Sequence, residues 1–317
     1  MHGWIILDKP LGLGSTQAVS AVKRALRQGG YGKAKVGHGG TLDPLATGVL
    51  PVAIGEATKL AGRMLDSDKV YEFTCRFGVE TDTLDLEGKI VAEGDVRPTL
   101  SEVEAVLPRF TGAIDQVPPA YSSLKVEGKR AYDLARAGEE VVLATRAVTV
   151  YNLDVAPAEA GAAALPGDGG AINSPAPASA GATLEEITLT IHVSKGTYIR
   201  SLARDIAHAL GTVGHVTMLR RTKAGPFDLR QAISLDKLDE LAKARSLEQR
   251  LLPLRAGLDD IPALALDPDQ AGALRQGRVL AGIAKDDGLY FAILGETPVA
   301  LVEVSSGEAR VVRGFNL

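Results

Sequence analysis

The stretch Gly37-His38-Gly39-Gly40-Thr41-Leu42-Asp43-Pro44-Leu45-Ala46-Thr47-Gly48 places one acid, Asp43, in a loop rich in glycine and proline. Four glycines in twelve residues suit neither the interior of a helix nor that of a strand. Pro44 pushes Asp43 away from helical dihedrals toward an extended or turn conformation. The pattern indicates either a reactive carboxylate directed at a ligand or a solvated connecting loop, and spacing alone does not separate the two.

The composition indicates a globular protein. The chain of 317 residues with 45% hydrophobic content suits a main domain of roughly 200 residues or more and a small one. Cys75 is the single cysteine, which excludes an internal disulfide and favours a reducing compartment. Because we find neither a signal-peptide pattern nor an apolar run of about 18 residues, we expect a cytoplasmic protein without a membrane span.

Charge is distributed unevenly along the chain. The net charge is −4, yet residues 1–65 hold eight Lys or Arg against three Asp or Glu, and residues 195–223 hold six against one. These two basic segments suit one face that meets a polyanion such as a nucleic acid. Basic residues on solvated helix faces would also explain them.

Hydrophobic periodicity predicts most of the regular elements. An apolar run over 4–7 predicts a strand, and helical spacing predicts a helix over 15–26 with Ser15 or Thr16 as its N-cap. Alternation predicts a half-buried strand over 70–80. Further predicted elements are a helix over 100–110, strands over 148–155 and 187–193, a helix over 199–210 capped by Thr197, helical and connecting segments over 234–260, and a mostly β region from about 261.

Residues 156–183 differ from the rest of the chain, because 11 of these 28 residues are Ala, five are Gly, four are Pro and none is aromatic. Such a segment cannot bury enough apolar surface to offset the entropy of ordering it. Since it separates two predicted strands, we interpret it as a disordered loop inserted into a hairpin. A linker between domains is the alternative.

Several kinds of catalytic site find little support. The histidines lack metal-binding spacing and there is no cysteine pair, while the motifs of phosphate loops, serine hydrolases and paired-aspartate proteases are absent. What remains is Asp43 in its glycine loop and Arg200 near the start of a predicted helix. A neighbouring arginine favours an ionised, oriented carboxylate nucleophile. Tyr71 or Tyr198 could stack on a planar base.

The loop sequence from Gly37 to Leu50 resembles the signature of the TruB family, the tRNA pseudouridine synthases that isomerise uridine 55 in the TΨC loop. The resemblance covers about residues 3–230. Many members read Gly-His-Thr-Gly at its start, so Gly39 should loosen the loop and remove a hydroxyl. Other segments agree in order and spacing: Leu7-Asp8-Lys9-Pro10, Gly55-Glu56-Ala57-Thr58-Lys59, Leu65-Asp66-Ser67-Asp68-Lys69-Val70-Tyr71, Thr81-Asp82-Thr83, Pro118-Pro119-Ala120-Tyr121-Ser122-Ser123-Leu124-Lys125, Lys195-Gly196-Thr197-Tyr198-Ile199-Arg200-Ser201-Leu202 and His215-Val216-Thr217-Met218-Leu219-Arg220-Arg221.

The resemblance implies an α+β fold, with a large mixed, mainly antiparallel sheet and flanking helices in a catalytic domain over 1–250. A small β-rich domain over 251–317 would follow and resembles a PUA-type RNA-binding module, although residues 255–317 are acidic. The implied activity is a tRNA-processing isomerase that flips uridine 55 out of the T arm. It implies tRNA as the partner of a monomeric enzyme, and no cofactor, because nothing is oxidised or transferred.

The resemblance also implies roles for individual residues. Asp43 matches the essential aspartate of the family, and Arg200 matches the arginine paired with it. The other matches are Tyr71, which packs on the target base and acts as base in a later proton transfer, His38, which fills the space of the flipped nucleotide, Lys9, which supports the site from the first strand, and Tyr198 and Leu219, which line the uracil pocket.

Two other classes of function stay open at this point. One is a non-catalytic factor that unfolds and refolds the T arm of tRNA, an activity that could also accompany isomerisation. The other is a pseudouridine synthase acting on ribosomal or messenger RNA. Replacement of Asp43 separates the first class from an enzyme, because a folding factor would not need the carboxylate.

Overall fold

The computed structural model describes residues 1–122, 124–126, 128–139, 141–157 and 182–317. These fold into two compact units, each of which is discontinuous in sequence. The first unit comprises Met1–Leu42, Val49–Leu65 and Ala224–Leu317, and the second comprises Asp43–Gly48 and Asp66–Lys223. Asp43 therefore belongs to a six-residue piece of the second unit, flanked on both sides by chain of the first.

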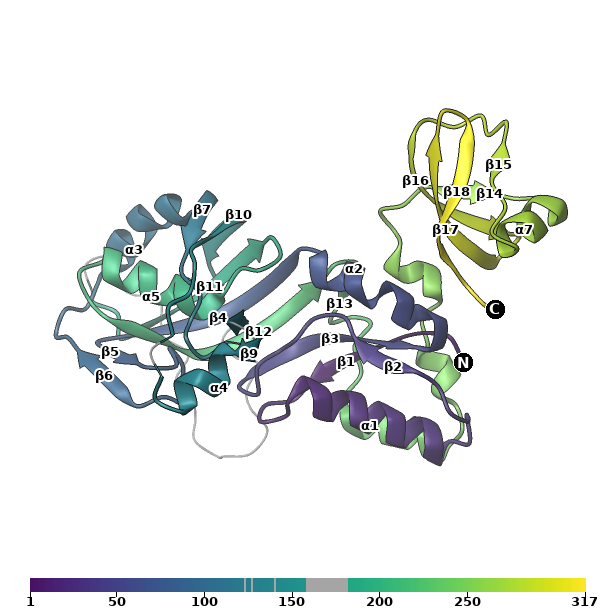
Figure 1. The fold of residues 1–317 in the computed structure, drawn as a ribbon. Helices are drawn as coiled ribbons and strands as arrows, with labels where there is room; N and C mark the ends of the chain where they lie inside the picture. Colours follow the sequence, from purple (N-terminus) through teal and green to yellow (C-terminus); the bar gives the residue numbers. More distant parts are fainter. Residues whose placement is uncertain (123, 127, 140, 158–181) are drawn as a thin grey trace. The chain divides into compact units, whose positions relative to one another are not determined.

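A mixed sheet forms the centre of the second unit (Figure 1). Its strands lie in the order β12-β4-β11-β10-β7, and β3 pairs in parallel with β12. The β4–β11, β11–β10 and β10–β7 pairs are antiparallel, which confirms the predicted mixed, mainly antiparallel α+β fold. The strands span β3 (Ala46–Ile54), β4 (Lys69–Phe77), β7 (Gly112–Gln116), β10 (Arg146–Val155), β11 (Glu186–Val193) and β12 (Gly214–Ala224).

Helices α3 (Leu100–Val106) and α5 (Ile199–Ala209) cover one face of this sheet and share its core. The predicted alternation on β4 is confirmed, because Phe73, Cys75 and Phe77 are buried there. Burying each such aromatic ring stabilises the fold by roughly 1.5–3 kcal/mol relative to leaving it exposed. The core of the second unit thus fixes α5, the helix that carries Arg200.

The β10 and β11 strands pair antiparallel, so the predicted partnership of the strands on either side of 156–183 is confirmed. Most of the inserted segment, residues 158–181, lies outside the described residues. Its predicted disorder stays a prediction.

The first unit begins with β1 (Gly3–Lys9), as the apolar run over 4–7 predicts. Strand β1 neighbours β3, and β2 (Val36–His38) pairs antiparallel with β3. Distant segments complete β1, through bridges from Trp4 to Leu252 and from Leu7 to Ile233. The helices of this part are α1 (Ser15–Gln28), α2 (Ala61–Asp66) and α6 (Leu235–Lys243), of which α1 and α6 lie against each other.

A five-stranded sheet in the order β14-β16-β17-β18-β15 ends the first unit. The mostly β region predicted from about 261 is confirmed, and it has its own buried core. Its assignment as a PUA-like domain over 251–317 stays a prediction. The elements are β14 (Ala263–Ala265), α7 (Pro268–Arg275), β15 (Leu280–Ala281), β16 (Gly288–Leu294), β17 (Thr297–Ser305) and β18 (Glu308–Gly314).

Two predicted helix caps are wrong. Helix α1 is capped by Gly14, whose N–H donates to the Gln17 side chain at 2.8 Å. Ser15 instead uses its hydroxyl to accept from the Leu42 N–H at 2.8 Å and to donate to the Leu42 carbonyl at 2.9 Å. The Thr197 hydroxyl bonds back to the Ser194 carbonyl. The Ser15 hydroxyl thus holds a loop that long-range packing brings to it, which local sequence patterns do not report, whereas Thr197 bonds within its own turn.

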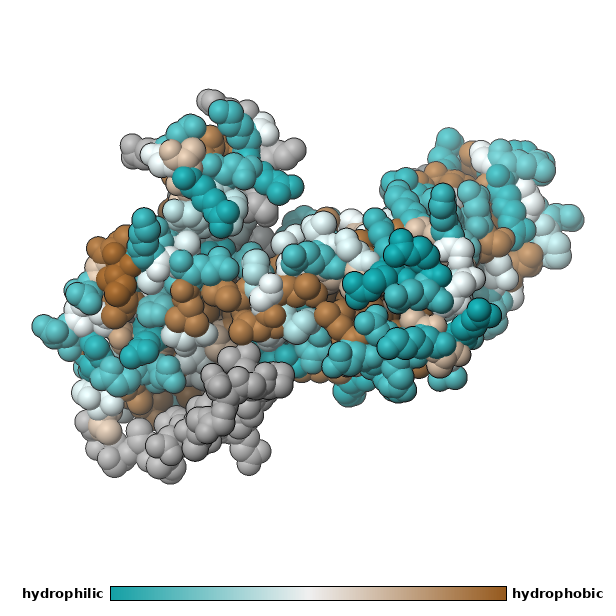
Figure 2. Space-filling view, turned by 90° about the horizontal axis from the view of Figure 1, so that it is seen from below, coloured by the Kyte–Doolittle hydropathy of each residue, from teal (hydrophilic) through white to brown (hydrophobic). Residues whose placement is uncertain are grey.

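Large hydrophobic side chains are exposed beside the two-stranded ribbon of β5 (Val79–Thr81) and β6 (Ile90–Glu93). Leu86 is 60% exposed, and Ile90 and Val91 are each 59% exposed. Hydrophobic groups gather at the left edge of Figure 2, where Figure 1 places this ribbon. Two strands alone cannot bury both of their faces.

No helix among the described residues is long and apolar enough to cross a membrane.

Gly48 makes the parallel pairing of β3 with β12 possible. It has a φ of +99°, and a Cβ placed there would lie 2.2 Å from the carbonyl oxygen of Arg221, its partner in the register. We predict that Gly48→Ala lowers the free energy of unfolding by about 3 kcal/mol or more, because the added atom forces these strands apart.

Gly112→Ala is the matched control for this change. Gly112 has a similar φ of +93°, but a Cβ there meets no described atom within 4 Å, so only about 1–2 kcal/mol of backbone strain is expected. Urea unfolding of both variants measures the difference. Equal losses in the two would contradict the close approach at Gly48.

Candidate active site

Arg200 is held at the start of α5 by the chain that leaves β11. Gly196, with a φ of +80°, turns the chain after the strand, and Tyr198 is the N-cap residue of the helix. Arg200 is then the second helical residue and is only 7% exposed. The apolar face of α5 packs into the core, so the arginine has a fixed origin.

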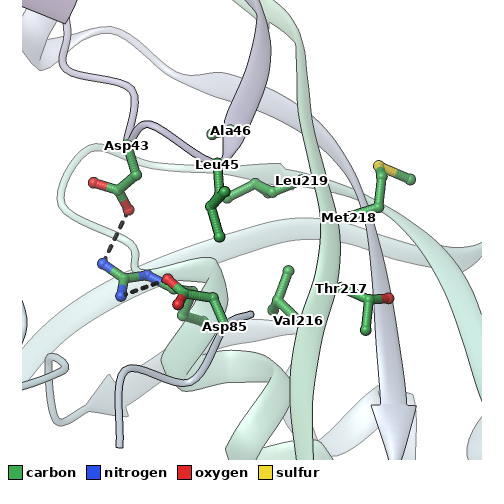
Figure 3. A pocket seen from close by; sticks show the side chains of 9 residues that line it. Asp43, Leu45, Ala46, Asp85, Val216, Thr217, Met218 and Leu219 are labelled. Carbon is green, nitrogen blue, oxygen red and sulfur yellow. Dashed lines mark hydrogen bonds and ion pairs between the residues drawn. The ribbon is translucent and has the colours of Figure 1, made fainter. Parts of the chain in front are cut away.

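The guanidinium of Arg200 makes four hydrogen bonds. Its Nη2 donates to Oδ2 of Asp43 at 2.9 Å and to the Tyr121 carbonyl at 3.0 Å. Its Nη1 donates to Oδ2 of Asp85 at 3.1 Å and to the Thr83 carbonyl at 2.7 Å. Figure 3 labels the two carboxylates, and its dashed lines mark the bonds that they accept. A planar, permanently charged group suits this arrangement, which a lysine could not reproduce.

The two carboxylates on Arg200 differ in their access to solvent. The Asp43 side chain is 47% exposed and that of Asp85 only 10%. No described residue hydrogen-bonds to Oδ1 of Asp43, whereas Oδ1 of Asp85 accepts from the Thr83 hydroxyl at 2.5 Å and from the Glu87 N–H at 3.0 Å. Asp43 therefore leaves one carboxylate oxygen open to solvent, whereas both carboxylate oxygens of Asp85 are hydrogen-bonded within the protein.

The turn that carries Asp85 is held in an unusual backbone conformation. Leu84 is buried and has a φ of +62°, which costs about 1–2 kcal/mol for a residue with a Cβ. This conformation lets the Thr83 carbonyl and the Asp85 carboxylate face the same Nη1 atom. Asp85 was not among the residues singled out from the sequence, although the motif Thr81-Asp82-Thr83 ends two residues before it.

Two cavities adjoin the ion pair and share Asp43, Leu45, Asp85 and Arg200 in their linings. The smaller cavity, which Leu219 also lines, has a volume of about 20 Å³. This volume suits one water molecule and is too small for a nucleobase. The larger, of about 430 Å³, is lined also by two tyrosines and an arginine, namely Tyr121, Tyr132 and Arg136. In Figure 3, Leu45 and Leu219 point toward each other beside Asp43.

Burial and the charges of this site also shift the pKa of Tyr198. Burial raises the pKa of its phenol, and the negative charge of Asp43 raises it further. The positive charges of Arg146 and Arg200 oppose that shift. The Tyr198 phenol is therefore protonated at neutral pH and can donate a hydrogen bond.

Comparison with known proteins shows what this chain is similar to. Residues 27–199 match the model described as TruB family pseudouridylate synthase (N terminal domain), and residues 200–259 match the tRNA pseudouridylate synthase B C-terminal domain. The chain belongs to the TruB family. Among its relatives, the tRNA pseudouridine synthase B of Novosphingobium aromaticivorans is 66% identical over 317 residues, covering 100% of this chain and 98% of that one. That of Zymomonas mobilis is 59% identical, covering 100% and 96%.

Solved structures agree on the fold. A structure titled "Crystal Structure of a Cbf5-Nop10-Gar1 Complex" contains a chain 25% identical with a TM-score of 0.68, covering 99% of this chain and 84% of that one. A chain in an H/ACA RNP bound to a substrate RNA containing 2′-deoxyuridine has a TM-score of 0.69 at 24% identity, covering 99% and 85%. Membership of the TruB family thus confirms the predicted pseudouridine synthase fold and enzyme class.

The residues predicted from the TruB resemblance divide between the two units. Asp43, Arg200 and Leu219 line one cavity of the second unit. Tyr71 lies on β4 opposite Ile191, half-buried against the core, and is not among the described residues that line either cavity with Asp43.

Lys9 and His38 are described within the first unit. The Lys9 side chain is fully buried, and its Nζ donates to the carbonyls of Pro10 at 3.1 Å and Leu13 at 2.6 Å. His38 is the last residue of β2 and pairs with Val52. Lys9 therefore ends β1 with its ammonium bonded to the turn before α1, and His38 lies at the start of the glycine loop. Their predicted roles at the substrate stay predictions.

Gly39 is a packing requirement in this chain. A Cβ at this position would lie 2.4 Å from the Cβ of Met64, which is buried on α2. The Gly39 N–H donates to the Pro51 carbonyl at 2.8 Å, so the backbone is fixed. Room for Met64 is therefore the reason for glycine here.

The basic segments are only partly available to a polyanion. Lys9, Arg200 and Arg221 are buried, and therefore do not contact phosphates from this conformation. Other cations remain on the surface of each unit and can supply the electrostatic attraction. The exposed ones are Lys23, Arg24, Arg27, Lys33 and Lys35 in the first unit and Lys195 and Lys223 in the second.

We predict that Asp85→Asn slows pseudouridine formation by about 10- to 100-fold, because Arg200 loses its buried counter-charge and shifts from Asp43. Single-turnover rates measure this effect, with thermal unfolding as the test of folding. Asp205→Asn is the matched control, since it removes the charge partner of Arg204 on the same helix, 2.8 Å away. An Asp85→Asn rate within twofold of wild type would contradict the role.

Proposed function

We propose that the protein converts uridine 55 in the T arm of tRNA into pseudouridine, with Asp43 as the nucleophile. The ion pair between Arg200 and Asp43 is the observation that carries this proposal. Full-length likeness to relatives named tRNA pseudouridine synthase B supports tRNA as the substrate.

The surroundings of Asp43 suit a nucleophile. A carboxylate must be ionised to attack, and the Asp43 carboxylate pairs with Arg200 at 2.9 Å. The same bond fixes the rotation of the carboxyl group, so that Oδ1 points to the open side.

The substrate base must leave the folded RNA to reach Asp43. Extruding a nucleotide from a folded loop costs a few kcal/mol, and stacking on an aromatic ring returns roughly 1–3 kcal/mol per base. Because the cavity at Leu219 holds only about 20 Å³, binding of uracil has to widen it toward the larger neighbouring cavity of about 430 Å³.

The isomerisation is redox-neutral and needs no group donor. The bond from C1′ of the ribose to N1 of uracil breaks, the base turns, and C1′ bonds to C5. C5 then loses its proton and N1 gains one, so the product has the same atoms as the substrate. Asp43 provides the nucleophile, and Tyr71 takes part in the later proton transfer. Tyr198 and Leu219 hold the detached base after the C1′–N1 bond breaks and before the C1′–C5 bond forms. His38 occupies the space left by the flipped nucleotide, Lys9 supports the site from the first strand, and exposed cations bind phosphates.

We predict that Asp43→Asn lowers pseudouridine formation at least 10³-fold while the dissociation constant for tRNA changes less than threefold. The amide keeps the size of the side chain but cannot attack. Single-turnover product analysis and filter binding measure the two quantities. Turnover by this variant would remove Asp43 from the nucleophile role.

The same variant tests a tRNA-folding activity. If the protein also refolds the T arm, Asp43→Asn retains the refolding of a misfolded tRNA while it forms no pseudouridine. Loss of both activities would tie refolding to catalysis.

The substrate assignment has its own test. Purified protein incubated with unmodified tRNA should yield pseudouridine at position 55, located by chemical mapping at single-nucleotide resolution. Absence of product at this position, or product on ribosomal or messenger RNA alone, would overturn the assignment. Mapping of cellular RNA in a deletion strain gives the same answer in the cell.

A further inference from the structure

Gln116 is a buried polar residue that lies outside the sequence motifs and outside both cavities at Asp43. It is the last residue of β7 and is 2% exposed. An amide buried at this depth is costly unless its polar atoms are paired. The contacts of Gln116 therefore show what it holds.

The side-chain amide of Gln116 makes two hydrogen bonds with the backbone of Tyr198. Its Oε1 accepts from the Tyr198 N–H at 2.7 Å, and its Nε2 donates to the Tyr198 carbonyl at 3.0 Å. The Tyr198 N–H needs an acceptor and the Tyr198 carbonyl needs a donor, and one amide supplies both. The two bonds therefore fix the orientation of the Gln116 amide.

Tyr198 is the point at which α5 begins. Among the described residues, no side chain caps this helix in the ordinary way, and the Tyr198 carbonyl accepts the first helical bond from Leu202 at 3.1 Å. Gln116 itself is anchored by the sheet, because it pairs with Arg146 of β10. The amide thus connects the edge of the sheet to the start of α5.

We propose that Gln116 is a positioning residue for isomerisation, which sets the start of α5 and thereby places Arg200 on Asp43. This rests on the proposed function. Arg200 follows Tyr198 by two residues, and its guanidinium has four partners to satisfy at once. A displacement of the helix start by about 1 Å would lengthen these bonds, and misplacement of that size can slow a reaction about 100-fold.

Gln116→Met tests this by removing both hydrogen bonds while filling similar space. We expect the single-turnover rate of pseudouridine formation to fall 10- to 100-fold, with the dissociation constant for tRNA within threefold of wild type. Gln231→Met is the matched control, because Gln231 accepts from the Asp228 N–H at 2.9 Å in the first unit, and its loss should leave the rate within twofold.

Gln116→Glu provides a signature that a merely structural role would not give. The ionised carboxylate can accept from the Tyr198 N–H but repels the Tyr198 carbonyl, whereas the protonated acid can donate to it. Burial beside a carbonyl raises the pKa of an introduced carboxyl. The rate of this variant relative to wild type should therefore recover at least fivefold between pH 8 and pH 5.5.

Three outcomes would overturn the positioning role. They are a Gln116→Met rate within threefold of wild type, a loss confined to tRNA binding, and a Gln116→Glu rate with the same pH dependence as wild type. If Gln116→Met does not fold, the pH dependence of Gln116→Glu decides. Wild-type protein that forms no pseudouridine would instead refute the proposed function, so the two failures are distinguishable.

Discussion

The buried guanidinium of Arg200 is the charge around which the second unit is arranged. A cation that is 7% exposed is stable only if its charge and its donors are matched, and removing one partner of such a pair costs about 3–5 kcal/mol. Asp85 and two backbone carbonyls supply the constant part of that match, and Asp43 supplies the part that remains open to solvent. The arrangement gives one carboxylate a structural task and leaves the other available for chemistry.

The core strand, the helix of Arg200 and the loop of Asp43 were predictable from the sequence, because local residue patterns indicate them. Alternation on β4 and helical spacing on α5 gave the core strand and the helix that bears Arg200. The glycines and Pro44 indicated that Asp43 lies outside regular structure, and the TruB resemblance then selected its partner. That Asp43 and Arg200 meet at 2.9 Å agrees with the pairing that the resemblance implied.

The rest depends on contacts between distant residues, which no local pattern reports. Asp85 reaches Arg200 only because Leu84 adopts a positive φ, and a leucine gives no sequence signal for that conformation. Gln116 meets Tyr198 across the sheet, 82 residues along the chain. The hydroxyl of Ser15 was expected to cap α1, but the loop at Leu42 takes it. Gly39 likewise makes sense only once Met64 is beside it.

Strand β1 has a consequence for how the protein is made. Its apolar residues are synthesised before their partners, because the bridges from Leu7 to Ile233 and from Trp4 to Leu252 need chain that emerges more than 200 residues later. At roughly 5–20 residues per second, a ribosome takes on the order of ten to fifty seconds to supply them. During that interval the Trp4-Ile5-Ile6-Leu7 run stays without those partners, and a nascent chain that carries it is a natural client for chaperones at the ribosome.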